Sequence, residues 1–135
     1  MYRVLVPVDT NEDRALTQAK FVASLPEAAT AVEAILLFVF HGEADDLPDE
    51  LKRFGSPQRV GSVRRASEYL EEHGIDVTTR EDSGDTARDV IDLADSEDVD
   101  LIVLGGRKRS PAEKVLFGSI SQSVLLGTDR PVVVT

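Results

Sequence analysis

Four basic side chains lie close together in a chain that is otherwise acidic. Arg107, Lys108, Arg109 and Lys114 fall within eight positions, whereas the whole sequence carries a formal net charge of −10. Gly105-Gly106 precedes this basic stretch, and Gly118-Ser119 follows it where a helix is predicted to begin. The free N–H groups and positive dipole end of a helix start bind anions, and a local reversal of charge attracts them. These groups together predict a phosphate-binding site.

A carboxylate follows another predicted strand. Asp9 comes directly after residues 3–8, a nearly all-apolar run, and Gly105 comes directly after the apolar run 101–104. Runs of this kind are typical of strands buried on both faces of a parallel sheet. In an open parallel sheet the ligand crevice lies at the carboxyl ends of the strands where the strand order reverses. We therefore expect Asp9 and Gly105 to lie at one crevice.

Each of these features also has a purely structural explanation. Gly105-Gly106 can form a tight turn, Ser119 can cap a helix, and the basic residues can balance acidic neighbours on a solvated face. The stretch from Asp9 to Asn11 offers cap chemistry for the helix that follows it. The order of these features along the chain and their shared place at one crevice favour the phosphate site.

Predicted strands and helices alternate along the 135 residues. The strands are residues 3–8, 34–40, 75–79, 101–104 and 132–134, and the third is short and polar enough for a sheet edge. Apolar residues at helical spacing predict helices from Ala15 until Pro26, from Val60 until Gly74, from 84–86 onward, and over 119–126. This alternation predicts one α/β domain, residues 1–135, with a doubly wound parallel five-stranded sheet.

Composition excludes several classes of function. The chain has no cysteine, which removes disulfides and thiolate chemistry, and because His41 and His73 are isolated we expect no metal site. The net charge of −10 disfavours nucleic acid and membrane surfaces as partners. No apolar run approaches the roughly 18 residues of a membrane span, so we expect a soluble, cytoplasmic protein. Abundant carboxylates with few lysines are typical of salt-loaded cytoplasms and predict a halophilic protein.

Three blocks of the sequence resemble the universal stress protein family, and together they extend over essentially the whole chain. They are the opening strand 4–9, the central block 84–87 with 100–105, and the end 116–121 with 131–134. The resemblance implies a sheet with strand order 3-2-1-4-5 and a site for an adenine nucleotide. It also implies a homodimer joined through the last strand, and the apolar edge Val132 to Val134 agrees with that.

The resemblance further implies which residues bind the nucleotide. Nucleotide-binding members of the family carry Gly, two residues, Gly, nine residues, then Gly and Ser or Thr. Here Gly105 and Gly118-Ser119 keep the spacing, and Lys108 stands in place of the second glycine. The nucleotide-binding residues implied are Pro7, Asp9 and Val39 toward the nucleoside, and Gly105, Gly118, Ser119 and Ile120 toward the phosphates. Val8, Leu104 and Lys108 complete the predicted nucleotide-binding set.

Three functions are compatible with this reading. The first is a stress-response regulatory module that binds ATP, or AMP or ADP, with or without Mg²⁺. The second is a slow ATPase or phosphotransferase, although the sequence has no P-loop and no serine elbow, and we assign no catalytic residue. The third is a nucleotide-free dimeric interaction protein of the same fold, which Lys108 makes credible because a side chain there can block the approach of phosphate to the backbone.

Overall fold

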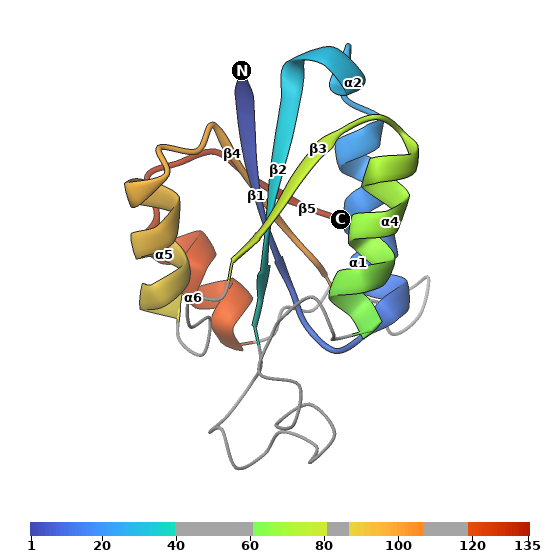
Figure 1. Ribbon diagram of the computed structural model, residues 1–135. Coiled ribbons are helices and arrows are strands. Elements are labelled where there is room, and N and C mark those ends of the chain that lie inside the picture. The colour runs from blue at the N-terminus through green and yellow to red at the C-terminus, as the bar shows by residue number, and fades with distance from the viewer. Residues whose placement is uncertain (40–60, 81–86, 107–118) are drawn as a thin grey trace, which may run out of the picture.

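The computed structural model describes residues 1–39, 61–80, 87–106 and 119–135, and these form one five-stranded parallel sheet between two layers of helices (Figure 1). The sheet has the order β3-β2-β1-β4-β5, and every neighbouring pair is parallel. The elements are β1 (Tyr2–Val8), α1 (Glu12–Ala23), α2 (Ala28–Ala31), β2 (Val32–Phe38), α4 (Gly61–Glu72), β3 (Asp76–Arg80), α5 (Ala87–Ser96), β4 (Leu101–Leu104), α6 (Ser119–Gly127) and β5 (Val132–Val134). The predicted fold class is confirmed.

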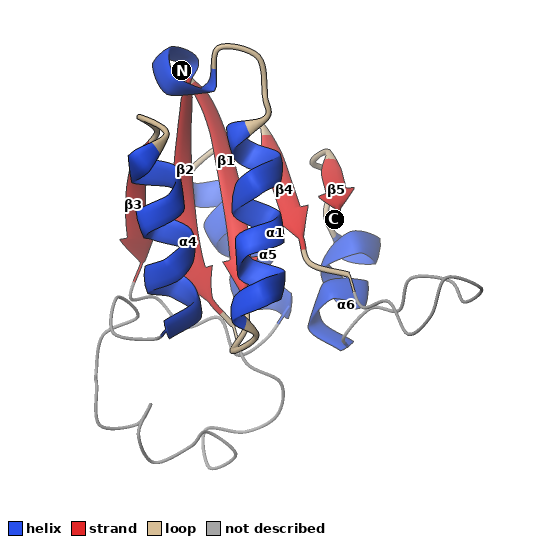
Figure 2. Ribbon diagram, turned by 90° about the vertical axis from the view of Figure 1, so that its right-hand side faces the viewer, coloured by secondary structure: helices blue, strands red, loops and turns tan. Residues whose placement is uncertain are grey.

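The two layers of helices bury opposite faces of the sheet (Figure 2). Helices α1 and α4 cover one face, where Val4, Val6 and Leu36 belong to one buried apolar cluster with the inner sides of both helices. Helices α5 and α6 cover the other face, where Leu5 and Ile102 belong to a second cluster. Because successive side chains of a strand point to opposite faces, the apolar runs of the sequence supply both clusters. Among the described residues, no helix is long and apolar enough to cross a membrane.

Some predicted boundaries differ from the observed ones. Strand β2 begins two residues earlier than predicted, and it is preceded by the four-residue helix α2, which the sequence pattern does not indicate. Helix α1 ends at Ala23, before Pro26, and the N–H of Ser24 donates to the carbonyl oxygen of Lys20 at 3.1 Å. This agrees with the tendency of helices to end at or before the residue that precedes a proline. The predicted helix start at 84–86 lies outside the described residues.

Helices α4 and α5 end in the same way. Gly74 follows α4 with a φ of +77°, and Asp98 follows α5 with a φ of +49°. In both cases the next N–H bonds back to the last turn of the helix: Ile75 N donates to Leu70 O at 3.0 Å, and Val99 N donates to Ala94 O at 3.1 Å. These are the hydrogen bonds of the left-handed helix termination that glycine favours. The prediction that Gly74 ends its helix is confirmed.

Arg130 fixes the segment that leads into β5. Its guanidinium donates to Asp95 Oδ1 at 2.9 Å, to Asp98 Oδ1 at 3.1 Å and to the carbonyl oxygen of Val99 at 2.7 Å. The hydrogen bond to Asp95, followed in size of effect by the one to Asp98, raises the pKa of Arg130 above its usual value. One cation thereby joins the end of α5 to the chain just before the edge strand.

Candidate functional site

The carboxyl ends of β1 and β4 lie where the sequence predicts the ligand crevice. The strand order reverses at this point, as it does at the ligand sites of open parallel sheets. The ladder between the two strands comprises only the pairs Val4 with Leu101 and Leu5 with Ile102. β1 continues to Val8 and β4 to Leu104 beyond the last of these pairs. The two strands therefore separate toward their carboxyl ends.

Gln18 on α1 bridges the opening between the two strands. Its side chain is buried, at 1% exposure, and its Nε2 group donates to the carbonyl oxygens of Pro7 at 2.7 Å and of Val103 at 3.0 Å. A buried amide is tolerated when its hydrogen bonds are made. Gln18 thus replaces the missing ladder bonds and sets the distance between the strands at the base of the crevice.

Asp9 lies at the mouth of this crevice, with both carboxylate oxygens engaged. Its Oδ1 accepts from the N–H of Asn11 at 2.9 Å, and its Oδ2 accepts from Nη1 of Arg14. The helix cap itself is Asn11, whose Oδ1 accepts from the N–H of Arg14 at 2.8 Å. Because Asn11 caps the helix, the Asp9 carboxylate is not committed to that role. The backbone of Asp9 is fixed separately, since its carbonyl oxygen accepts from the hydroxyl of Ser62 on α4.

Arg14 connects Asp9 to Gly105. A β-carbon built on Gly105 would lie 2.6 Å from both Cγ and Cδ of Arg14 and 3.1 Å from Oε1 of Gln18. Real β-carbons do not approach other atoms so closely, so the glycine at this position makes room for the Arg14 side chain. The sequence pattern does not single out Arg14 and Gln18, which lie in the first and second turns of the helix that follows Asp9.

The structure brings most of the expected binding residues to these strand ends. Pro7, Val8, Asp9, Leu104 and Gly105 lie at the ends of β1 and β4. Val39 follows β2, and its N–H donates to the carbonyl oxygen of Val8 at 2.7 Å.

Ile120, in the first turn of α6, belongs to the same buried apolar cluster as Val39 and Leu104. Ser119 is the first residue of that helix. Lys108, Gly118 and the rest of the basic stretch lie outside the described residues, as does the side chain of Ser119.

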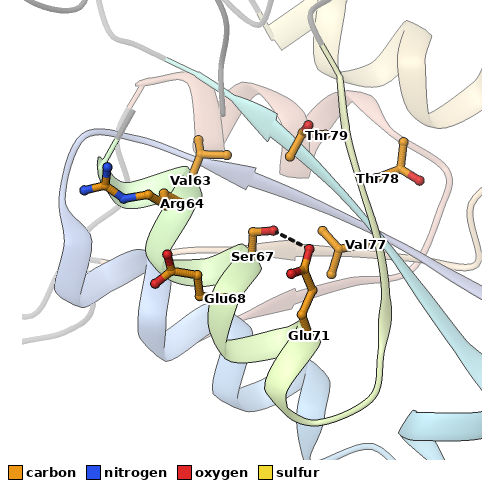
Figure 3. Close-up of a pocket in the computed structure, with 8 residues that line it drawn as sticks. All are labelled: Val63, Arg64, Ser67, Glu68, Glu71, Val77, Thr78 and Thr79. Carbon is orange, nitrogen blue, oxygen red and sulfur yellow. Dashed lines mark hydrogen bonds between the residues drawn. The ribbon is translucent and has the colours of Figure 1, made fainter. Parts of the chain in front are cut away.

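A separate cavity of about 450 Å³ lies between α4 and the edge strand β3 (Figure 3). Its size is within the range of small-molecule sites. It is lined by Val63, Arg64, Ser67, Glu68, Glu71, Val77, Thr78 and Thr79. The lining carries two carboxylates, Glu68 and Glu71, and one guanidinium, that of Arg64, so its formal charge is negative. Ser67 donates to Glu71 Oε1 at 3.2 Å. This lining disfavours a phosphate, so we take the crevice at β1 and β4 as the candidate site.

No group of three or more potential metal ligands is present in the part of the chain that the structure describes. Asp9 and Arg14 are charged groups at these strand ends, and they form an ion pair with each other. The Asp9 carboxylate and the Arg14 guanidinium can offer a ligand hydrogen bonds and ion pairs.

Comparison with known proteins gives a consistent family. The sequence model described as "Universal stress protein family" matches residues 1–135. A universal stress protein of Mycolicibacterium smegmatis is 35% identical over 75 residues, which are 55% of this chain and 58% of that protein. The chain thus matches little more than half the length of this relative.

Solved structures resemble the whole fold. A universal stress protein from Archaeoglobus fulgidus is 25% identical and has a TM-score of 0.73, with 99% of this chain and 98% of that chain covered. A structure of the Archaeoglobus fulgidus universal stress protein in complex with dAMP is 22% identical and has a TM-score of 0.70, with 99% and 97% covered. The second likeness is one of fold.

Proposed function

The chain belongs to the universal stress protein family, and from this membership we propose that it is a stress-response regulatory module that binds an adenine nucleotide. The observation that carries the proposal is the crevice between β1 and β4, where Asp9 and Gly105 lie on either side of the point at which the strand order reverses. The complex of a protein of this fold with dAMP supports the choice of an adenine nucleotide.

In this proposal the nucleoside lies against the ends of β1 and β2. We place Pro7, Val8 and Val39 at this end of the site, where the side chains of Val8 and Val39 belong to the apolar clusters on opposite faces of the sheet. The Asp9 carboxylate accepts a hydrogen bond from the nucleoside. The phosphates of ATP lie toward Gly105 and the start of α6 at Ser119, since a helix start favours an anion. Leu104, Lys108, Gly118 and Ile120 complete the proposed set. Mg²⁺ would accompany ATP as part of the ligand.

A nucleotide-free interaction protein is the second candidate, and one observation favours it. The Asp9 carboxylate is already occupied by Arg14, whose side chain also covers Gly105. A ligand that takes the place of the guanidinium at this carboxylate must displace the Arg14 side chain. If that displacement is too costly, the fold acts through its surfaces alone.

Both candidates involve a homodimer joined through β5. On either side of this strand, the carbonyl oxygen of Pro131 accepts from Ile102 N at 3.0 Å and the N–H of Thr135 donates to Leu104 O at 2.9 Å, both on β4. Because backbone groups alternate in direction along a strand, those of Val132 and Val134 point to the outer edge. An apolar edge of this kind pairs readily with a second copy.

Titration calorimetry tests the proposal directly. The purified chain is titrated with ATP and Mg²⁺ in molar KCl, beside a Lys108→Gly variant that restores the glycine of the family motif. We expect micromolar binding by the unmodified chain. Binding by the variant alone would identify the nucleotide-free protein instead. If neither protein binds ATP, the proposed nucleotide-binding function is wrong.

A further inference from the structure

Arg14 and Asp9 form an ion pair at the carboxyl end of β1. Both carboxylate oxygens have a partner, and the two side chains are only 20% and 14% exposed. An ion pair that is largely shielded from water is stronger than one on an open surface. A ligand that hydrogen-bonds to Asp9 must therefore compete with a guanidinium.

Arg14 also covers the backbone on the other side of the crevice. Its Cγ and Cδ each lie 2.6 Å from the position that a β-carbon of residue 105 would take. The glycine leaves a path across the end of β4 along which the aliphatic part of Arg14 runs toward Asp9. One side chain thus covers both walls of the site.

We propose that Arg14 determines the specificity of this site for phosphorylated over unphosphorylated nucleosides: its guanidinium, which pairs with Asp9, transfers to a phosphate when a nucleotide binds. This inference rests on the proposed function, because it assigns a role within the same site. The Arg14–Asp9 ion pair then serves to discriminate nucleotides from unphosphorylated nucleosides.

The chemistry of the exchange follows from what each ligand offers. A nucleoside such as adenosine can donate hydrogen bonds to Asp9, but it leaves the displaced guanidinium without an anion, which is costly in a partly buried site. A nucleotide supplies phosphate oxygens, and guanidinium binds phosphate with the same paired geometry that it uses for carboxylate. The displaced cation is therefore compensated only when the ligand carries phosphate.

The exchange does not require helix α1 to change. The backbone of Arg14 is held independently of its guanidinium, because its N–H donates to the Asn11 cap at 2.8 Å. The nearby Gln18 keeps β1 and β4 at a fixed separation through its own two hydrogen bonds. Only the flexible end of one side chain needs to move.

The test is a comparison of ATP and adenosine affinities in three proteins: the unmodified chain, Arg14→Met and Arg14→Lys. Methionine keeps an unbranched apolar stem over Gly105 and removes the charge, whereas lysine keeps the charge without the planar fork. Lys20→Met, an exposed position on the same helix, is the matched control. Circular dichroism confirms that each variant is folded.

We expect Arg14→Met to lower the affinity for ATP by about tenfold, the loss typical of one charge-assisted hydrogen bond. Its affinity for adenosine should rise, because Asp9 is then open. The ATP affinity of Arg14→Lys should lie between those of the unmodified chain and Arg14→Met. Lys20→Met should bind both ligands with the affinities of the unmodified chain. A ratio of ATP to adenosine affinity that is the same in the Arg14→Met and unmodified proteins would overturn the proposal.

Inorganic tripolyphosphate separates this inference from the proposed function. If no protein binds a nucleotide, the proposed function fails, and tripolyphosphate binding that is lost in Arg14→Met would still establish Arg14 as a phosphate ligand. If tripolyphosphate binds the unmodified and Arg14→Met proteins equally, or binds neither, the role of Arg14 in phosphate binding is wrong.

Discussion

The side-chain amide of Gln18 donates a hydrogen bond to the carbonyl oxygen of Val103 at 3.0 Å, and so joins helix α1 to β4 across β1. The same amide donates to Pro7 on β1 at 2.7 Å. A helix residue therefore holds together two strands at the point where their own ladder has ended. A single buried glutamine thus connects the carboxyl ends of β1 and β4, where the strand order reverses.

Replacing Gln18 with leucine should destabilise the protein. Leucine has a similar size but leaves the carbonyl oxygens of Pro7 and Val103 buried without their donor, which we expect to lower the free energy of unfolding by about 2 kcal/mol. Urea denaturation followed by circular dichroism measures this. Lys20→Leu, at an exposed position of the same helix, should change stability by less than about 0.5 kcal/mol. An equal effect of both variants would show that the bridge contributes nothing.

Replacing Gly105 with alanine should be costly only while Arg14 is present. The new methyl group would lie 2.6 Å from Cγ and Cδ of Arg14, so the arginine must move and its contact with Asp9 is strained or lost. We expect a loss of about 1–3 kcal/mol in the free energy of unfolding. In an Arg14→Ala background most of this loss should disappear. Additive costs in this double-mutant cycle would contradict the close packing of the two residues.

The sequence predicts the sheet well because strands that are buried on both faces of a parallel sheet consist of continuous runs of apolar residues. The runs ending at Val8 and Leu104 lie where they are expected, and the strand order, implied by the family resemblance, is confirmed. Helix α2 is not predicted, because four residues are too few to show a periodicity.

The candidate site is predicted only in part. Asp9 and Gly105 follow apolar strands, so their place at the strand ends can be read from the sequence. Gln18 contacts Val103 on β4, and Arg14 contacts Asp9 and covers Gly105. The contacts with Val103 and Gly105 depend on how α1 packs on the sheet. A polar residue on the inner side of an amphipathic helix gives no periodic signal of its own.

Substitutions at Gly74 and Asp98, the two residues with left-handed backbone conformation at helix ends, should change the free energy of unfolding in opposite directions. Gly74→Ala should lower the free energy of unfolding by about 1 kcal/mol, since a side chain is strained at a φ of +77°. Asp98→Gly should raise it by up to about 1 kcal/mol, because glycine relieves the strain at +49° and the lost ion pair to Arg130 is exposed. Thermal denaturation of both variants measures the effects. A stabilised Gly74→Ala protein would mean that this φ is not kept in solution.

The excess of acidic residues predicts that salt stabilises the protein. The chain has 25 Asp and Glu against 15 Lys and Arg, and the screening length falls from about 10 Å at 0.1 M salt to about 3 Å at 1 M. Repulsion between carboxylates should weaken accordingly. We expect the thermal midpoint to rise by about 5 °C or more between 0.1 and 2 M KCl.

A less acidic variant provides the control for this salt effect. Glu72→Gln with Asp76→Asn removes two exposed charges at the turn between α4 and β3, and its midpoint should rise less with KCl. A midpoint that is unchanged or lower in high salt would remove the halophilic interpretation.

The proposed dimer makes a prediction about one backbone N–H. Thr135 N donates to β4, so alternation directs the N–H of Val134 to the outer edge of the sheet. Val134→Pro removes that donor and leaves the hydrogen bonds on the β4 side in place. We expect the mass measured by light scattering to fall from two chains to one. Val134→Thr, which keeps both the N–H and a β-branched side chain, should remain a dimer. If the proline variant is a folded dimer, the two copies are joined by another surface, and the apolar edge of β5 serves only the core.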